Sequence, residues 1–280
     1  MSSPAERVTA SLLRGWGLPD PGDSKKSRGE VVIVGGSRTS PGAALLAGEA
    51  SLRVGAGRVA LAVPQSIDAH VGIALPEAGV LALPDDAGAP LEGRLRDQIA
   101  SADAVLVGSG FSDADETRAT LSAVAAVGPG ILVLDAFALG VLADVDRSSL
   151  PENLVLNPNK EEASILLRRD LGEDDEADVR EIADRYAAVV NCYGVVAHPD
   201  GRVWRVDEGD AGLATSGSGD VLAGAITGFA ARGLDPAHAA VWAAWTHGRA
   251  GRLLGARFGL GYLARELARE LPAALRAVAP

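Results

Sequence analysis

The sequence predicts an α/β fold with a mainly parallel sheet that is covered by helices on both faces. Two observations lead to this fold class. Short runs rich in β-branched residues alternate with helical patterns, and the runs are apolar throughout, as in strands that are buried on both faces. The 280 residues are 48% hydrophobic, which is enough for a sizeable core. We therefore expect one domain over residues 1–280.

The strand and helix units follow one another along the first half of the chain. The expected strands are EVVIVGG, RVALAVP, AVLVGSG, GILVLDA and NLVLNP, and the expected helices lie at 41–53, 116–125 and 159–167. The acidic run at 172–181 predicts a solvated helix with carboxylates in its first turn.

The second half of the chain has a different pattern. AAVVNCYGVVAHPDGRVWRV predicts strands around a Pro-Asp-Gly turn. Helical spacing then predicts three helices, at 218–232, 236–257 and 263–276. There is no convincing interdomain linker between the two halves.

Composition and charge limit the function classes. A net charge of −11 disfavours binding to nucleic acid or to anionic membranes, and the aromatic content of 4% leaves few stacking platforms for bases. No apolar run reaches eighteen residues and the first twenty residues carry charges, so we expect neither a membrane span nor export. Cys192 is the single cysteine, so no internal disulfide can form. We predict a cytoplasmic protein.

A glycine turn, ATSGSGDVLAG, precedes the predicted helix at 218–232. The first amides of a helix have no internal partner, and Gly217 and Gly219 leave room for a phosphate to approach them. Asp220 beside that phosphate suits a general base that faces a hydroxyl. The alternative is a plain turn in which Asp220 only caps the helix.

The run Gly217, Gly219 and Asp220 resembles the G-x-G-D element of the ribokinase-like superfamily. Residues 31–64 are similar over their length to the opening of the NAD(P)H-hydrate dehydratases, and WAAWTHGRAG around His247 resembles their penultimate helix. The resemblance implies a ribokinase-like three-layer α/β/α sandwich. A Rossmann cofactor site is weaker, because the glycines after the first strand do not form G-x-G-x-x-G.

The same resemblance implies roles for individual residues. Asp220 is the expected catalytic base, and Glu162 is expected to hold Mg²⁺ through water. The expected contacts to the dinucleotide substrate are Ala43, Gly110, Asn159 and Asp220. The expected contacts to the nucleotide and its phosphates are Gly217, Ser218, Gly219, Asn191, Cys192, Tyr193 and Gly194.

Several of these positions have a second interpretation. Asn159 and Glu162 also fit a capping box, and Asp135 at a strand end fits either the family's aspartate or a helix cap. His247 is expected to be packed and hydrogen-bonded, and His70, His198 and His238 lack metal-ligand spacing.

Two departures from the family pattern stand out. Asn159 occupies the position of the family's histidine, and VVNCYG lacks the family's nucleotide-site lysine.

The resemblance implies repair of hydrated NADH or NADPH. ADP or ATP would phosphorylate the ring hydroxyl, and elimination of phosphate would give NAD(P)H plus AMP or ADP, with Mg²⁺ as cofactor. A homotetramer is also implied. The alternatives are a ribokinase-like kinase that acts on a vitamin precursor, and a catalytically impaired nucleotide-binding sensor. The choices between ADP and ATP, and between the NADH and NADPH hydrates, stay open.

Overall fold

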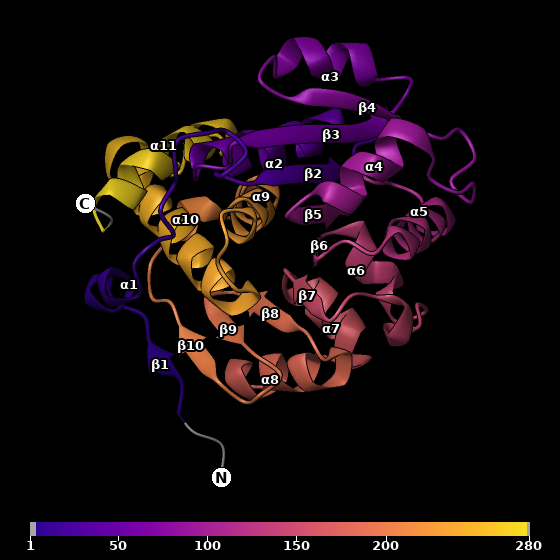
Figure 1. Cartoon of the computed structure of the whole chain (residues 1–280). Coiled ribbons are helices and arrows are strands. Elements are labelled where there is room, and N and C mark those ends of the chain that lie inside the picture. Colours follow the sequence, from indigo (N-terminus) through magenta and orange to yellow (C-terminus); the bar gives the residue numbers. More distant parts are fainter. Residues whose placement is uncertain (1–3, 279–280) are drawn as a thin grey trace.

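A ten-stranded sheet forms the centre of the molecule in the computed structural model, which describes residues 4–278 (Figure 1). The strand order is β1-β10-β9-β8-β7-β6-β5-β2-β3-β4, and among these described strands only β9 runs antiparallel to its neighbours. The strands are β1 (Glu6–Arg7), β2 (Glu30–Val34), β3 (Arg58–Pro64), β4 (Gly79–Leu83), β5 (Ala104–Val107), β6 (Ile131–Leu134), β7 (Asn153–Leu156), β8 (Val189–Cys192), β9 (Val195–Ala197) and β10 (Val203–Arg205). The mainly parallel sheet confirms the predicted fold class.

Helices cover both faces of this sheet. Successive strand residues point to opposite faces, so Val31 and Ile33 belong to one core while Val32 and Val34 belong to the other. The first core is closed by α1 (Ala10–Trp16), α2 (Pro41–Arg53), α3 (Asp68–Ala74), α9 (Ser218–Ala231), α10 (Pro236–Phe258) and α11 (Ala264–Arg276). The second is closed by α4 (Gly93–Ser101), α5 (Ala114–Val127), α6 (Phe137–Leu142), α7 (Lys160–Leu167) and α8 (Asp175–Tyr186). Two short 3₁₀ helices lie at Arg147–Ser149 and Ala211–Leu213.

The direction in which successive strands are added to the sheet reverses at β2, and the candidate site lies at this reversal. From β2 the chain continues to β3 and β4 on one side of the sheet and then returns to β5 on the other side. Open α/β sheets bind ligands outside the carboxyl ends of the strands at such a point. The loops after β2 and β5 are joined at this point, because the Gly36 amide donates to the Ser109 carbonyl at 2.8 Å.

Helix α9 packs very closely against α2. A Cβ atom on Gly224 would lie 2.2 Å from the carbonyl oxygen of Ala47, so only glycine fits there. The buried Ser51 hydroxyl lies 2.9 Å from the Ala47 carbonyl and 2.8 Å from the Gly224 carbonyl. These contacts fix the position of α9, and with it the glycine turn at its N-terminus.

The predicted strands and helices all occur, and the strands around the Pro-Asp-Gly turn are β9 and β10. Six further elements were not predicted from the sequence: β1, α1, α3, β4, α4 and α6. Strand β1 is only two residues long; it pairs with β10, and the Val8 amide donates to the Arg205 carbonyl at 2.8 Å.

The expectation that the acidic run forms a solvated helix is wrong for one face of α8. Asp175 and Glu176 lie in the first turn as expected, but Asp178 in the same turn is buried. Its carboxylate accepts a hydrogen bond from Arg169 at 2.8 Å and another from the Gly172 amide at 2.6 Å. The side chain is buried because these two donors replace water.

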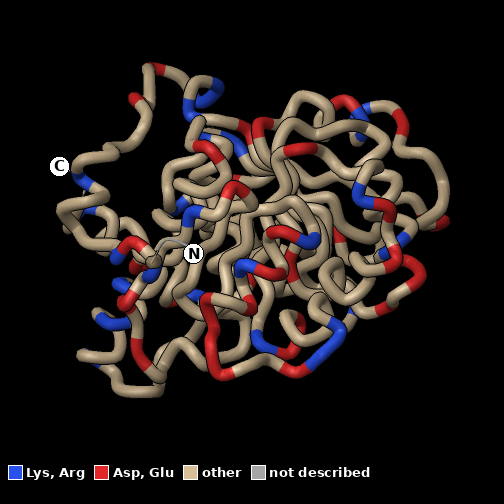
Figure 2. The backbone as a smooth tube through the Cα atoms, turned by 90° about the horizontal axis from the view of Figure 1, so that it is seen from below, with Lys and Arg blue, Asp and Glu red and all other residues tan. Residues whose placement is uncertain are grey.

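Acidic and basic positions are interspersed along the backbone trace in Figure 2. Within residues 4–278, no helix has both the length and the apolar character that a membrane crossing requires.

Candidate active site

The N-terminus of α9 is built as an anion site. Gly217 is its N-cap in the left-handed conformation, with φ of 87°, and no side chain caps the helix. The Ser218 amide donates to the Thr215 carbonyl, whereas the amides of Gly217, Gly219 and Asp220 have no acceptor among residues 4–278. The predicted amide donors are therefore present, except that Asp220 replaces Ser218 among them.

Gly219 leaves the space beside these amides open. A Cβ atom on Gly219 would meet no heavy atom within 4 Å, and the residue is exposed. Asp220 is half-buried in the first turn of the same helix. Burial raises the pKa of Asp220, and a hydrogen bond from Ser109 opposes that rise. A carboxylate with a raised pKa next to free amides suits proton removal beside a phosphate.

A chain of buried side chains runs along the carboxyl ends of four neighbouring strands. Ser109 follows β5, Asp135 follows β6, Asn157 follows β7, and Asn191 lies in β8. The Ser109 hydroxyl donates to Asp135 Oδ2 at 2.8 Å, and Asn157 Nδ2 donates to Asp135 Oδ1 at 2.9 Å. Asn191 Nδ2 donates in turn to Asn157 Oδ1 at 2.8 Å. Asp135 is thus held by its neighbours, and no salt bridge reaches it within the described residues.

Burial and the charge of Asp220 raise the pKa of Asp135 to about 8, with Glu162 adding to the rise. The hydrogen bonds from Asn157 and Ser109 act in the opposite direction. Three carboxylates, on α7, on α9 and at the end of β6, therefore influence one another across this site.

The structure brings Ala43 and Gly110 together at the switch point between β2 and β5. Gly110 has a φ of 84°, and a Cβ atom there would lie 2.8 Å from the Ala43 Cβ and 2.7 Å from the Ser40 carbonyl oxygen. Glycine is thus required at position 110 for both the turn and the close approach. The two predicted substrate contacts therefore lie next to each other at the switch point.

Asn159 and Glu162 form the capping box that the sequence analysis considered as the alternative. The Glu162 amide donates to Asn159 Oδ1 at 2.9 Å, and the Asn159 amide donates to Glu162 Oε2 at 2.9 Å. Burial raises the pKa of Glu162, and the charges of Glu161 and Asp220 add to the rise. Glu162 has one carboxylate oxygen outside the box, while the Asn159 side chain is exposed at the start of α7.

The four predicted nucleotide contacts at 191–194 differ in accessibility. The Asn191 side chain is 2% exposed and serves the buried chain, and burial raises the pKa of Cys192 to about 12, so its thiol stays protonated. Tyr193 is 65% exposed, and both it and Gly194 have positive φ, of 46° and 81°. Only the turn formed by Tyr193 and Gly194 presents a surface to a ligand.

A lysine does lie at this turn, although none is near it in the sequence. Lys160 Nζ is 5.1 Å from the centre of the Tyr193 ring, within range of a cation–π contact. Lys160 is exposed and forms no salt bridge among residues 4–278. The first residue of α7 thus supplies a cation where the strand at 189–192 has none.

Ser218 and His247 lie behind the glycine turn. His247 Nε2 is 3.0 Å from the Ser218 carbonyl oxygen and 3.1 Å from its hydroxyl. Burial lowers the pKa of His247 to about 4, so the ring is neutral and Nε2–H donates. This confirms that His247 is packed and hydrogen-bonded, and it shows that the Ser218 side chain is buried against the His247 ring.

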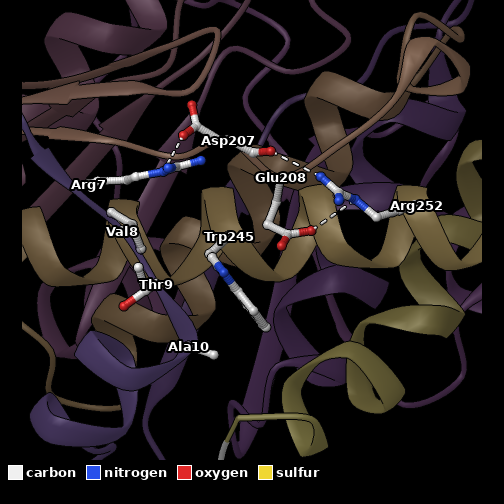
Figure 3. A pocket seen from close by; sticks show the side chains of 8 residues that line it. All are labelled: Arg7, Val8, Thr9, Ala10, Asp207, Glu208, Trp245 and Arg252. Atoms are coloured by element: carbon white, nitrogen blue, oxygen red, sulfur yellow. Dashed lines mark hydrogen bonds and ion pairs between the residues drawn. The ribbon is translucent and has the colours of Figure 1, made fainter.

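A separate cavity of about 320 Å³ lies beside β1 and α10 (Figure 3). Its charged side chains are paired, Arg7 with Asp207 at 2.7 Å and Arg252 with Glu208 at 3.1 Å. None of its lining residues is a predicted site residue. We place the candidate active site at the glycine turn, since the free amides and the perturbed carboxylates lie there.

Ser109 and Asn157 are site residues that were not predicted from the sequence. Both stand among the first residues after a buried strand, as Asp135 does. The position of a polar residue directly after an apolar strand was the available signal, because the carboxyl ends of parallel strands meet at one edge. Which of these side chains bond to one another depends on the strand order, which the sequence does not reveal.

Residues 31–273 match the family described as NAD(P)H-hydrate dehydratase. The ADP-dependent (S)-NAD(P)H-hydrate dehydratase of Xanthomonas campestris pv. campestris is 42% identical, and the match covers 98% of each chain. The bifunctional NAD(P)H-hydrate repair enzyme Nnr of Escherichia coli is 34% identical over 94% of this chain. The match covers 50% of that enzyme, so this chain spans about half its length.

Solved structures agree with the fold. The ADP/ATP-dependent NAD(P)H-hydrate dehydratase of Bacillus subtilis, co-crystallised with ATP and Mg²⁺ and soaked with CoA, is 26% identical with a TM-score of 0.84. The match covers 99% of this chain and 100% of that one. A ribokinase-like superfamily protein of Enterococcus faecalis, 23% identical, gives a TM-score of 0.85 over 98% of this chain and 96% of its own. These similarities confirm the predicted ribokinase-like fold.

Proposed function

The chain belongs to the NAD(P)H-hydrate dehydratase family, and on this basis we propose that it dehydrates hydrated NADH or NADPH at the expense of ADP or ATP. The products are NAD(P)H, phosphate, and AMP from ADP or ADP from ATP. The observation that carries the assignment to this site is the position of Asp220. Its carboxylate has a raised pKa and stands in the first turn of α9, beside amides that have no acceptor within the described part of the chain.

The first step of the proposed reaction is phosphoryl transfer. The hydroxyl on the reduced nicotinamide ring attacks the terminal phosphorus of the nucleotide, and Asp220 accepts the hydroxyl proton. The bond to the departing nucleotide breaks as the new P–O bond forms. The free amides of Gly217, Gly219 and Asp220 donate to the oxygens of the transferring group, where negative charge gathers.

The second step is elimination. Hydroxide is a poor leaving group, whereas phosphate leaves readily when the ring nitrogen pushes with its lone pair. The adjacent ring carbon then loses a proton to water, and the electrons of its C–H bond restore the diene. Ala43 and Gly110 form the wall along which the dinucleotide lies in this proposal, with Asn159 at the start of α7.

The residues at the site fit Mg²⁺ that arrives with a nucleotide. Residues 4–278 contain no group of three His, Cys, Asp or Glu side chains close enough to hold a metal ion alone. Magnesium is commonly held by one or two carboxylates together with water and substrate phosphates. Glu162, with one oxygen outside the capping box, would hold it through water, and the ion would neutralise phosphate charge next to Asp220.

Asp220→Asn tests the proposed base. Purified protein is incubated with hydrated NADH, Mg²⁺ and either ADP or ATP, and the recovery of reduced-nicotinamide absorbance is followed. We expect a loss of about 10²- to 10⁴-fold in kcat, because the amide cannot accept the proton. Asp115→Asn, which removes a first-turn carboxylate from α5, is the matched control and should keep wild-type kcat.

The outcomes of this assay separate the alternatives. No recovery with either nucleotide from folded wild-type protein would reject the proposed reaction. Phosphorylated product without free phosphate would instead identify a kinase, and nucleotide binding without turnover would identify a sensor. Unchanged recovery in Asp220→Asn would reject only the assignment of the base.

We further propose that the chain works as a single domain in a cytoplasmic homotetramer. Phe258, Leu260 and Leu263 support an association surface, since their large apolar side chains are exposed between α10 and α11. Light scattering coupled to size exclusion measures the assembly. A monomer at micromolar concentration would reject the homotetramer.

A further inference from the structure

His247 of α10 holds the first carbonyl group of α9. Its Nε2 atom lies 3.0 Å from the Ser218 carbonyl oxygen, and the residue is 6% exposed. A carbonyl oxygen can only accept, so Nε2 carries the proton of this hydrogen bond. Nε2 is also 3.1 Å from the Ser218 hydroxyl oxygen. The His247 ring is therefore a buried donor that lies directly behind the glycine turn.

The carbonyl that His247 holds belongs to the same peptide group as the Gly219 amide. A trans peptide is planar, and its C=O and N–H bonds point in opposite directions. A donor fixed on the Ser218 carbonyl therefore fixes the direction of the Gly219 N–H, which points away from His247. Gly219 is exposed, and its amide has no acceptor within the described part of the chain.

The hydrogen bond from His247 also makes the Gly219 amide a stronger donor. A donor on a carbonyl draws electron density from the amide nitrogen of the same peptide group, and hydrogen bonds in a row polarise one another. Burial lowers the pKa of His247 to about 4, so the ring stays neutral at neutral pH. His247 thus acts on the turn through a hydrogen bond and adds no net charge.

Helix α10 also fixes the segment that leads into the glycine turn. A Cβ atom on Gly248 would lie 2.6 Å from the Glu208 carbonyl oxygen, and one on Gly251 would lie 2.6 Å from Leu213 Cδ2. Residues 208–213 therefore lie directly against α10. The glycine turn that follows is held by this one helix both at its entry and at the first residue of α9.

We infer that His247 is a positioning residue for phosphoryl transfer, because it orients and polarises the Gly219 amide through the Ser218 carbonyl. This inference rests on the proposed function. His247 neither touches the substrate nor transfers a proton. Its effect reaches the reaction through the Gly219 N–H, which donates to an oxygen of the transferring phosphoryl group as negative charge gathers there.

Three substitutions of His247 test this role in the repair assay. His247→Leu removes the donor and should lower kcat by about tenfold, less than the 10²- to 10³-fold expected when a whole donor is lost. His247→Gln places an amide N–H near the position of Nε2 and should keep kcat within about threefold of the wild type. His247→Asn has the same amide on a side chain one methylene shorter, so it should lose activity as His247→Leu does.

Thr246→Val is the matched control, since Thr246 is fully buried next to His247 and its hydroxyl has no partner among residues 4–278. It should keep the wild-type kcat. The contrast between the Gln and Asn variants remains a test if His247→Leu does not fold. Wild-type kcat in His247→Asn, or equal losses in His247→Asn and His247→Gln, would overturn the inference.

A measurement on the resting protein keeps this inference separate from the proposed reaction. Glycines are labelled with ¹⁵N, and Gly219→Ala assigns the Gly219 signal by its loss. We expect the Gly219 ¹⁵N signal to move upfield in His247→Asn and to stay near its wild-type position in His247→Gln and Thr246→Val. A merely structural role of His247 would not produce this pattern.

The two possible failures have different signatures. An unmoved Gly219 signal in His247→Asn rejects the role of His247, even if the wild type does not repair hydrated NADH. Failed repair by the wild type together with a moved Gly219 signal rejects only the reaction.

Discussion

Lys160 and Tyr193 lie 33 positions apart in the sequence, yet they form one surface beside the active site. Lys160 rests over an exposed ring and has no carboxylate partner among residues 4–278. The site otherwise contains the acids Asp135, Glu162 and Asp220, which repel a nucleotide's phosphates. An unpaired ammonium is therefore well placed to offset part of that repulsion.

Lys160→Ala should weaken ADP binding by about fivefold, the effect expected when a partly solvated charge contact of about 1 kcal/mol is removed. Calorimetric titration with ADP and Mg²⁺ measures the change. Lys26→Ala removes another exposed lysine, distant in sequence from the site, and should bind ADP as the wild type does. Equal affinity in both variants would exclude Lys160 from the nucleotide site.

Asp135 should also make stability depend on pH. Its pKa is about 8 in the folded protein and 3.8 as the ordinary value, so the folded state binds the proton more tightly. The stabilisation is complete below about pH 4 and is lost as pH rises toward 8. Urea unfolding at pH 5, 6.5 and 8 should give a falling free energy of unfolding, and Asp135→Asn should show a flatter dependence. Equal slopes of the unfolding free energy against pH in the wild type and in Asp135→Asn would contradict a raised pKa at Asp135.

At the scale of elements, the contact between α2 and α9 determines where the glycine turn lies. A Cβ atom at Gly224 would approach the Ala47 carbonyl oxygen to 2.2 Å, and backbone atoms cannot give way without moving a helix. Because Asp220 is in the first turn of α9, displacement of this helix also displaces the proposed base.

Gly224→Ala should lower the free energy of unfolding by about 1–3 kcal/mol, since an overpacked helix contact costs that much. Gly140→Ala is the matched control, because Gly140 lies in α6 and an added Cβ there meets nothing within 4 Å. There alanine should be neutral or stabilising by up to about 1 kcal/mol. Equal effects of the two substitutions in urea unfolding would refute the close contact.

Elements with a strong pattern were predictable, and those without one were not. The runs that became β2, β3, β5, β6 and β7 are apolar except for the first residue of β2, β3 and β7, so both their type and their position followed from the sequence. Strand β1 consists of Glu6 and Arg7, whose side chains carry no strand signal, and it exists only because β10 is there to pair with it.

The same distinction holds within the site. Gly217, Gly219 and Asp220 lie within four consecutive residues, so local chemistry predicted them together. The links from Ser109 to Asp135 and from Lys160 to Tyr193 join different elements, and they depend on strand order and helix placement. A capping box and a metal site require the same spacing at Asn159 and Glu162, so spacing alone left that choice open.

At the scale of the whole molecule, the site is assembled from distant parts of the chain. Ala43, Ser109, Asp135, Asn157 and Asp220 come from α2, the loops after β5, β6 and β7, and α9. No short segment contains the constellation. The site therefore requires that the sheet and both helix layers be formed.

Loss of activity in urea should coincide with loss of helical circular dichroism, because the site cannot survive partial unfolding of the sheet. Fluorescence gives an independent signal, since Trp204, Trp242 and Trp245 are buried in the first core. Three coincident midpoints are expected. Activity lost well before the other two signals would indicate that the site opens locally.

Strand β1 has a consequence for aggregation. Strand β10 would otherwise end the sheet with free backbone groups, and such an edge recruits strands from other molecules. The pairing of Glu6 with Trp204 and of Arg7 with Arg205 covers it with charged residues, and Trp204 Nε1 donates to Glu6 at 3.1 Å. Two residues are too few to template a further strand. The shortest strand of the described chain thus discourages growth of the sheet from one molecule into the next.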